Sequence, residues 1–245
     1  MRVGLVGLGL VGGSLALALR ATHDVVAYDS DAGVRSSARS AGLAVVDALA
    51  VVIPADVVVV ATPFSAIVPT LRDLAPRAGA TVLLDVGSLK RPIAAYAETA
   101  PAEARIVGGH PMAGTTGAGF ASADPTLFRG RPFLLVPTAR SDQQAMDVAS
   151  ALARAAGAEP TVCSAEAHDR AIATLSGVPL AVALALSRSG EDVARLAGPG
   201  FRDATRLAAT PRDLADVLLR GNRDEVKAAL RRFRDALDEV ERDLG

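Results

Sequence analysis

Residues 3 to 14 read VGLVGLGLVGGS, an apolar run that passes directly into a glycine-rich turn. In a Gly-x-Gly-x-x-Gly turn between a strand and a helix, the first glycine permits the tight turn and the second lets a pyrophosphate approach the backbone. The third lets helix and strand pack closely, and the helix start offers free N–H groups to the phosphates. The stretch therefore predicts a dinucleotide site made by Gly7, Leu8, Gly9, Leu10, Val11 and Gly12.

Short apolar runs alternate with helix-like stretches over the first two thirds of the chain. The expected strands are Val3–Val6, Val25–Tyr28, Val57–Ala61, Thr81–Asp85, Arg105–Val107, Phe133–Val136 and Pro160–Val162. Helices are expected between them, at Ser14–Arg20, Ala32–Ala41, Ala66–Leu74 and Asp142–Ala156. Several strands are apolar on both faces, as parallel strands covered by helices on both sides must be. The pattern predicts an α/β fold with a Rossmann-like, doubly wound parallel sheet.

The pattern changes near Ser164, after which no convincing strand follows. Ala165–Ser187 is too apolar for a surface helix, so we expect it to be buried within its domain or between subunits. Arg223–Leu244 carries an apolar seam on a charged helix, which favours packing against its own domain and leaves a subunit contact as the alternative. We therefore expect a dinucleotide-binding domain, residues 1–163, and a smaller all-α domain, residues 164–245.

Two further strand ends are candidates for contact with the cofactor. Asp29 ends the second expected strand, where a carboxylate can accept hydrogen bonds from the adenosine ribose and would repel a 2′-phosphate. It therefore favours NAD over NADP, although Arg35 nearby points weakly the other way; alternatively, Asp29 caps the helix that starts near Asp31. Thr62 and Pro63 end the third expected strand and either border the cofactor crevice or simply terminate the strand.

Ser88 and His110 follow the next two strands, within DVGSLK at 85–90 and GGHP at 108–111. Ligands of doubly wound sheets bind beyond the carboxyl ends of the strands, so the two side chains are expected to be neighbours. An imidazole, with an ordinary pKa of about 6.5, is a proton acceptor near neutral pH. The alternatives are a packed loop histidine for His110 and, for Lys90, either an anion ligand or a solvated lysine at a helix start.

The composition sets broad limits on partners and location. The 245 residues include 26 basic and 27 acidic side chains, which gives no reason to expect nucleic acid or an anionic membrane as a partner. The single cysteine, Cys163, excludes an intramolecular disulfide and fits a reducing cytosol. The apolar amino terminus lacks a basic region and is interrupted by glycines, so neither a signal peptide nor a membrane span is expected. We expect a cytoplasmic globular protein, and no metal site is predicted.

Six motifs occur in one order along the chain. They are GLGLVGGS at 7–14, DVGSLK at 85–90, GGHPMAG at 108–114, LF and then LLVP within 127–137, AEAHDRAIATLS at 165–176 and GFRDATRLA at 200–208. Together they resemble the prephenate dehydrogenase family, which includes arogenate and cyclohexadienyl dehydrogenases. The HPMAG and HDR motifs carry this resemblance more specifically than the glycine turn does.

The resemblance implies a reaction and a set of roles. That family oxidises a cyclohexadiene C4 alcohol by hydride transfer to NAD and releases the ring carboxylate as CO₂, which converts prephenate to 4-hydroxyphenylpyruvate in tyrosine biosynthesis. By resemblance, His110 would accept the hydroxyl proton, Ser88 would hold the geometry and Arg206 would bind a substrate carboxylate, whereas Arg202 is expected to be a surface or structural residue. The HDR motif that starts at His168 is expected to be structural. The helical domain would bind substrate and form a homodimer.

The chain also departs from the family. Thr116 and Gly117 stand where relatives commonly carry an acidic and then a polar residue, and Ser-Gly-Val-Pro-Leu at 176–180 replaces Ser-His-Leu-Pro-His. Thr115, Thr116 and Gly177 are therefore candidates for contact with the variable arm of the substrate. Prephenate, arogenate and 4-amino-4-deoxyprephenate all stay open.

Two other classes of function are alternatives. β-Hydroxyacid dehydrogenases and imine reductases usually place a catalytic lysine or acid on the long interdomain helix, but Ala165–Ser187 offers only His168, Asp169 and Arg170, near its start. A non-catalytic dinucleotide-binding protein would need only the nucleotide half. The presence of Ser88, His110 and Arg206 together argues against it.

Overall fold

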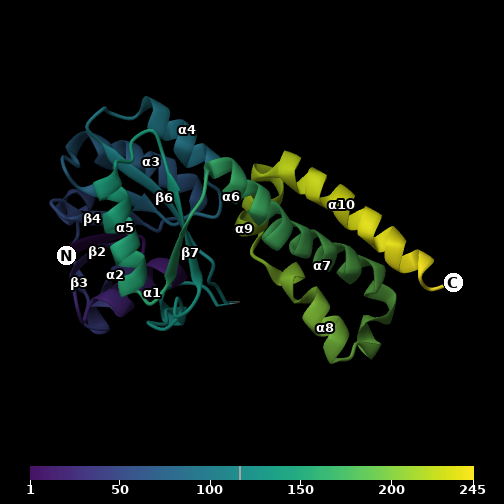
Figure 1. The fold of residues 1–245 in the computed structure, drawn as a ribbon. Coiled ribbons are helices and arrows are strands. Elements are labelled where there is room, and N and C mark those ends of the chain that lie inside the picture. Colours follow the sequence, from purple (N-terminus) through teal and green to yellow (C-terminus); the bar gives the residue numbers. More distant parts are fainter. Residues whose placement is uncertain (116) are drawn as a thin grey trace. The chain divides into compact units, whose positions relative to one another are not determined.

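The computed structural model describes residues 1–115 and 117–245, which divide into two compact units (Figure 1). The first unit, residues 1–165, holds one sheet with helices on both faces, and the described regular elements of the second unit, residues 166–245, are all helices. The predicted fold class is confirmed.

The sheet has eight strands in the order β3-β2-β1-β4-β5-β6-β7-β8. Their bounds are β1 Arg2–Val6, β2 Asp24–Tyr28, β3 Ala44–Val45, β4 Val57–Val60, β5 Val82–Asp85, β6 Arg105–Pro111, β7 Pro132–Pro137 and β8 Glu159–Val162. All neighbours pair in parallel except β6 and β7, which are antiparallel. The expectation of an entirely parallel sheet was therefore wrong at β7, and the two-residue β3 was not predicted.

The strand that carries His110 is longer than its apolar pattern indicates. We predicted an end at Val107, but β6 continues to Pro111 because β7 pairs with its second half, with His110 opposite Leu134. His110 therefore belongs to a strand and not to the loop that the sequence indicates.

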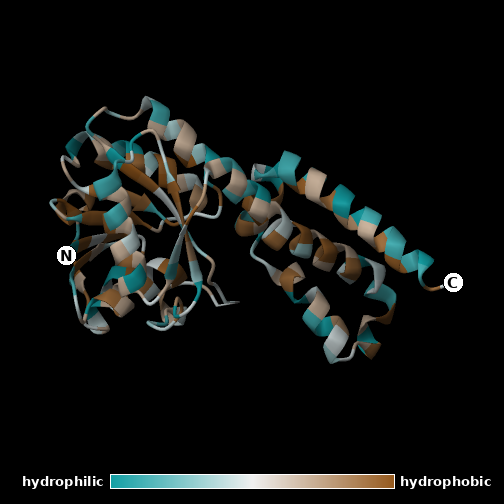
Figure 2. Ribbon diagram, in the orientation of Figure 1, coloured by the Kyte–Doolittle hydropathy of each residue, from teal (hydrophilic) through white to brown (hydrophobic). Residues whose placement is uncertain are grey.

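Two apolar clusters fill the space between the sheet and its helices. Figure 2 shows the hydrophobic colour concentrated on the central strands of this unit. The covering helices are α1 Leu10–Leu19, α2 Ala32–Ser40, α3 Phe64–Leu74, α4 Arg91–Thr99 and α5 Gln143–Ala155, of which α4 was not predicted. Alternate residues of β4 divide between the two clusters: Val57 and Val59 join the cluster with α1, α2 and α5, and Val58 and Val60 join the cluster with α3 and α4. Full burial of such side chains contributes roughly 1.5–3 kcal/mol each.

The second unit is built around one interrupted helical stretch. α6 (Ala165–Ile172) passes through a π-helical turn, η4 (Ala173–Gly177), into α7 (Val178–Ser189). Pro179 lacks the N–H of an ordinary helical residue, which explains why the hydrogen-bond pattern changes there. The remaining elements are η5 Glu191–Leu196, α8 Pro199–Thr205, η6 Arg206–Ala209, α9 Arg212–Asp216, η7 Val217–Gly221 and α10 Arg223–Arg242.

This unit buries little apolar surface by itself. Its core cluster consists of Ala173, Val178, Val226 and Ala229. The seam of α10 is packed at Val226, whereas Leu237 and Val240 are 51% and 57% exposed. Packing of the seam against its own domain therefore holds only for the first half of α10.

By length and composition alone, the helical stretch Ala165–Ser189 could cross a membrane, a test that core helices of water-soluble proteins also pass.

Candidate active site

The three glycines of the turn after β1 occupy three different environments. Gly7 has φ +93°, and a Cβ there would lie 2.6 Å from the carbonyl oxygen of Ala61. A Cβ on Gly12 would lie 1.9 Å from the carbonyl oxygen of Gly7, so this glycine is required for helix and strand to pack. A Cβ on Gly9 would meet nothing within 4 Å. The turn is therefore closed on two sides and open at Gly9, as a backbone that receives a pyrophosphate must be.

Asp29 is tied to this turn. Its Oδ2 accepts a hydrogen bond from the Leu8 N–H at 2.7 Å, and its Oδ1 accepts one from the Asp31 N–H at 2.9 Å. The cap of α2 is Asp31, whose side chain accepts from the Val34 N–H. The alternative that Asp29 caps this helix was therefore wrong. A carboxylate has about four acceptor positions, so Asp29 keeps capacity for ribose hydroxyls.

Arg35 is held by nearby protein groups. Its Nη1 donates to the carbonyl oxygens of Asp29 and Ser30 at 2.8 and 3.0 Å, and its Nε donates to Asp47 at 3.2 Å. These contacts give Arg35 a local structural role at the end of β2.

Thr62 lies beyond the end of β4. Its Oγ1 is buried and has no hydrogen-bond partner among the residues that the structure describes. A buried hydroxyl left in this condition costs free energy, and a ligand group can satisfy it. Pro63 follows directly and caps α3.

A buried ion pair lies between the carboxyl ends of β5 and β6. Lys90 and Asp85 are both fully buried, and Lys90 Nζ donates to Asp85 Oδ2 and, at 2.6 Å, to the carbonyl oxygen of Gly109. Burial raises the pKa of the Asp85 carboxyl, and the Lys90 ammonium opposes that rise. The expectation of a solvated lysine was wrong, because Lys90 is fully buried, and the alternative that it binds an anionic ligand stays a prediction. The sequence analysis missed this pair, although an aspartate that ends a strand five residues before a lysine is the signal for it.

Ser88 and His110 directly follow Gly87 and Gly109, whose backbone groups form hydrogen bonds with this ion pair. Both side chains are half-buried. Because β5 and β6 are neighbours, the carboxyl edge of the sheet presents Asp29, Gly7, Thr62, Ser88 and His110 from the strands β2, β1, β4, β5 and β6, in spatial order. The cofactor candidates and the two chemical candidates therefore lie on consecutive strands of one edge.

The segment after His110 returns to the start of α1. A Cβ on Gly13 would lie 2.8 Å from the ring of Phe120, and buried Ser14 Oγ accepts from the Asp124 N–H at 2.9 Å. Between His110 and Phe120 in the sequence, Thr115 is exposed, and its Oγ1 accepts a hydrogen bond from the Gly117 N–H at 3.1 Å. Thr116 lies outside the described residues.

The remaining candidates lie in the second unit. Arg206 is exposed at the start of η6, and Arg202 is exposed and donates to the carbonyl oxygen of Ala197 at 2.7 Å. Gly177 is buried in the π-helical turn, where a Cβ would lie 2.7 Å from Val226 Cγ2 of α10.

The HDR motif of α6 is buried at its first two residues. His168 Nδ1 pairs with Asp169 Oδ1 at 2.7 Å, and Asn222, which precedes α10, donates to the carbonyl oxygen of Asp169 at 2.6 Å. These contacts join α6 to the start of α10 and give His168 and Asp169 a structural role within this unit.

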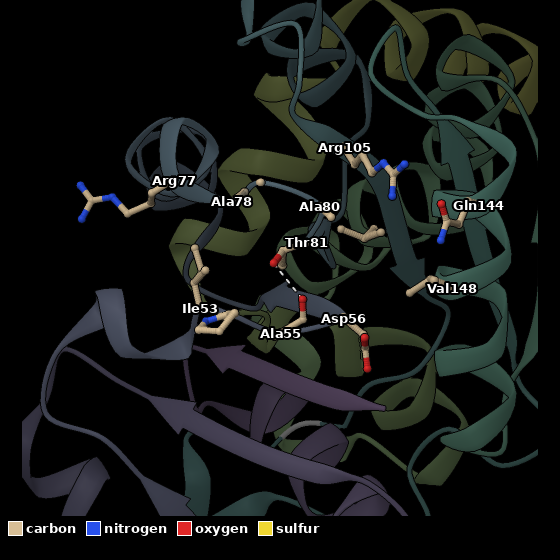
Figure 3. A pocket seen from close by; sticks show the side chains of 13 residues that line it. Ile53, Ala55, Asp56, Arg77, Ala78, Ala80, Thr81, Arg105, Gln144 and Val148 are labelled. Atoms are coloured by element: carbon tan, nitrogen blue, oxygen red, sulfur yellow. Dashed lines mark hydrogen bonds between the residues drawn. The ribbon is translucent and has the colours of Figure 1, made fainter.

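A separate cavity of about 470 Å³ lies at the amino edge of the sheet (Figure 3). Its polar lining is largely engaged: Asp56 accepts from the Arg2 N–H, Thr81 donates to the carbonyl oxygen of Ala55, and Arg105 pairs with Asp142. The candidate residues above are absent from its lining as described. This cavity is therefore not the candidate site, which we keep at the carboxyl edge of the sheet.

Comparison with known proteins supports the division into a nucleotide-binding domain and a helical domain. Residues 15–162 match the family model described as prephenate dehydrogenase, nucleotide-binding domain, and residues 164–244 match prephenate dehydrogenase, dimerization domain. The chain is 34% identical to a prephenate dehydrogenase of Bacillus subtilis (strain 168), over 97% of this chain and 68% of that protein. It is also similar to the structure of Synechocystis arogenate dehydrogenase, with TM-score 0.84 and 28% identity over 98% of this chain and 90% of that one. Prephenate dehydrogenase from A. aeolicus, in complex with hydroxyphenyl propionate and NAD+, gives TM-score 0.89 and 25% identity over 99% and 90% of the two chains.

Proposed function

Because the chain belongs to the prephenate dehydrogenase family, we propose that it oxidises the C4 alcohol of prephenate and releases the ring carboxylate as CO₂. The observation that carries this proposal is the order of groups along the carboxyl edge of the sheet. Ser88 follows β5, and His110 lies near the carboxyl end of β6, next to the strand ends that carry the candidate nucleotide residues.

In this reaction His110 accepts the proton of the C4 hydroxyl as the C4–H bond breaks. Ser88 donates to or accepts from the same hydroxyl and holds it toward the imidazole. The bond to the ring carboxylate then breaks, CO₂ leaves, and the electron pair enters the ring, which becomes aromatic. His110 returns its proton to the phenolic oxygen, so the residue ends the cycle in its starting state.

The residues at β1, β2 and β4 fit NAD as the cofactor. When bound, its nicotinamide accepts the hydride from C4. Gly9 leaves the turn open for the pyrophosphate, and Thr62 offers a buried hydroxyl without a described partner. Asp29 supplies acceptors for ribose hydroxyls, and Arg35 is already engaged by Asp47 and two carbonyl oxygens, which together favour NAD over NADP.

Prephenate is the first choice of substrate, and arogenate and 4-amino-4-deoxyprephenate are the alternatives. All three carry carboxylates, for which the planar guanidinium of Arg206 is suited. Prephenate and arogenate differ at the keto or amino group of the side-chain arm, for which Thr115, Thr116 and Gly177 are the proposed contacts. The 4-amino compound instead carries an amine in place of the C4 hydroxyl. The names of two similar proteins, a prephenate and an arogenate dehydrogenase, keep this question open.

The direct test mixes purified protein with NAD and each of the three cyclohexadienes in turn and follows NADH fluorescence. We expect the largest kcat/KM with prephenate. A larger value with arogenate reassigns the substrate and keeps the oxidation of a C4 alcohol. A larger value with the 4-amino compound, which has no C4 hydroxyl, makes a C4 amine the group that loses its proton to His110. No turnover with any of the three contradicts the proposed function.

His110→Asn tests the role of the histidine. Asparagine keeps a polar side chain of moderate size but cannot accept the proton, so turnover should fall by roughly 10²–10⁴-fold. The affinity for NAD should stay close to that of the original protein, because the nucleotide residues lie on other strands. Equal loss of turnover and NAD affinity would assign His110 a structural role instead.

We also propose that the protein is a cytoplasmic homodimer formed through its second unit. Leu175, Leu196 and Leu237 are 63%, 71% and 51% exposed there, and the matching family model is named a dimerization domain. Burial of such side chains against a second copy would remove apolar surface from water. Light scattering that shows a stable monomer at micromolar concentration would contradict this assembly.

A further inference from the structure

We propose that the Asp85–Lys90 ion pair positions both Ser88 and His110, by holding the backbone immediately before each of them. This inference rests on the proposed function for the meaning of Ser88 and His110. Neither Asp85 nor Lys90 is assigned contact with substrate or cofactor, so both are positioning residues.

The carboxylate of Asp85 reaches both segments at once. Its Oδ2 accepts a hydrogen bond from the Gly87 N–H at 2.8 Å, and its Oδ1 accepts one from the Gly109 N–H at 3.3 Å. Gly87 directly precedes Ser88, and Gly109 directly precedes His110. A displacement of this single side chain would therefore move both candidate groups.

Lys90 completes the arrangement at Gly109. β5 ends at Asp85, and its register with β6 extends only as far as Leu84 opposite Val107. Beyond that point Asp85 Oδ1 receives the Gly109 N–H, and Lys90 Nζ donates to the Gly109 carbonyl oxygen at 2.6 Å. The two side chains thus replace the missing strand partner and satisfy buried backbone groups that would otherwise be left unpaired.

Glycines around the pair allow this close approach. A Cβ on Gly109 would lie 2.5 Å from the carbonyl oxygen of Asp85, and one on Gly108 would lie 3.0 Å from Lys90 Cδ. A Cβ on Gly87 would lie 2.6 Å from Ile67 Cδ1. The Gly-Gly before His110 and the Gly before Ser88 are therefore explained by the ion pair and its packing.

Stability alone does not account for a fully buried pair. Replacement of buried ion pairs by apolar residues of similar volume is often neutral or stabilising, because desolvation offsets the attraction between the charges. Here the charged atoms form hydrogen bonds with the backbone of Gly87 and Gly109, which apolar side chains cannot form. The contribution of the pair is therefore to fix the backbone positions that precede Ser88 and His110.

The test is the double variant Asp85→Asn/Lys90→Met, which removes both charges with little change in volume. We expect kcat to fall by about 100-fold, the loss that a displacement of about 1 Å can cause, while the Kd for NAD changes less than about 2-fold. The matched control is Arg105→Met/Asp142→Asn, which removes a pair at the opposite end of β6. Its kcat should stay within about 3-fold of the original.

A second readout does not depend on turnover. The chain has three histidines, so ¹⁵N-histidine labelling gives few imidazole signals to follow as the pH changes, and the His110→Asn variant assigns the signal of His110. The double variant should shift the midpoint of the His110 curve and leave that of His23 unchanged. If the unmodified protein turns over no cyclohexadiene but this shift is present, the positioning holds and the proposed function fails.

Two outcomes overturn the inference. One is a double variant that keeps its kcat within about 3-fold and an unchanged His110 curve. The other is a loss of kcat that is matched by equal losses of NAD affinity and thermal stability. If the double variant does not fold, Asp85→Asn alone decides: we expect about a 10-fold loss of kcat with unchanged NAD affinity, and an unchanged kcat rejects the role.

Discussion

The two edges of the sheet in the first unit use similar residues in opposite ways. At the amino edge, a cavity of about 470 Å³ is lined by polar groups that mostly bond to nearby backbone or side chains, and Arg105 and Asp142 form an ion pair that is 28% and 49% exposed. At the carboxyl edge, Asp85 and Lys90 form a pair that is fully buried. Glycines there bring backbone against backbone and against this pair.

The cavity at the amino edge and the candidate site residues therefore lie at opposite ends of the sheet. A cavity with satisfied walls offers little to a ligand, whereas the carboxyl edge combines an open glycine, a buried hydroxyl without a described partner and a titratable imidazole. Matched substitutions at the two edges test whether NAD binding and turnover depend on the carboxyl edge alone.

The largest effect on NAD binding is expected from glycine to alanine exchange. Gly12→Ala places a Cβ 1.9 Å from the Gly7 carbonyl oxygen, a distance that forces α1 away from β1. Overpacking of this kind typically costs about 1–3 kcal/mol and occasionally more. We expect loss of NAD binding and a lower melting temperature, measured by calorimetric titration and by circular dichroism.

Gly79→Ala is the control at the amino edge. Gly79 lines the cavity, and a Cβ there would meet nothing within 4 Å, although φ is +57°. The backbone conformation alone should cost about 1–2 kcal/mol, and NAD affinity should not change. Equal loss of NAD affinity in both variants would remove the distinction between the edges.

The second effect concerns the two ion pairs. Lys90→Ala leaves Asp85 buried without its cation, which should lower the free energy of unfolding by about 3–5 kcal/mol. Arg105→Ala breaks a partly exposed pair, for which about 0–1 kcal/mol is expected. Urea denaturation followed by circular dichroism measures both. Similar losses in the two variants would show that the burial of Lys90 does not matter.

The sequence predicted the parts of this fold that depend on local pattern. Val57–Val60 reads as a strand buried on both faces, and it is one. The direction of β7 is not encoded in its own apolar residues, so the extension of β6 through His110 could not be foreseen. The sequence allows Lys90 to be either an anion ligand or a solvated lysine at a helix start, and its burial depends on the space that Gly108 leaves some twenty residues later. Non-local contacts of this kind escape single-sequence reasoning.

The third effect compares two buried hydroxyls. Ser14→Ala removes the acceptor for the Asp124 N–H, and Thr81→Val removes the donor to the Ala55 carbonyl oxygen. Each loss should cost about 1 kcal/mol of stability. Only Ser14 anchors the segment that leads back from His110 and Thr115, so only Ser14→Ala should raise KM, by a few-fold. An equal change of KM in both variants would assign it to general destabilisation.

The smallest effect is a pH dependence of stability that arises at Asp124, whose N–H donates to Ser14. The Thr126 N–H and hydroxyl donate to Asp124 Oδ1, each at 2.7 Å, and these bonds hold the pKa of this carboxyl below its ordinary value. A lowered pKa means that the folded state binds the proton less readily than the unfolded state. The associated stability is therefore complete above the unfolded-state pKa and is lost as the pH falls through the folded-state pKa.

Asp124→Asn removes this titration and keeps an oxygen that can accept from Thr126. Between pH 5 and pH 2, the urea midpoint of the original protein should consequently fall slightly more steeply than that of the variant. Since Asp124 is exposed, solvent screening keeps the difference small, and it should shrink further in Thr126→Val, which lacks the hydroxyl donor. Parallel acid profiles for all three proteins would mean that the bonds to Asp124 do not contribute to the stability of the segment that joins His110 to α1.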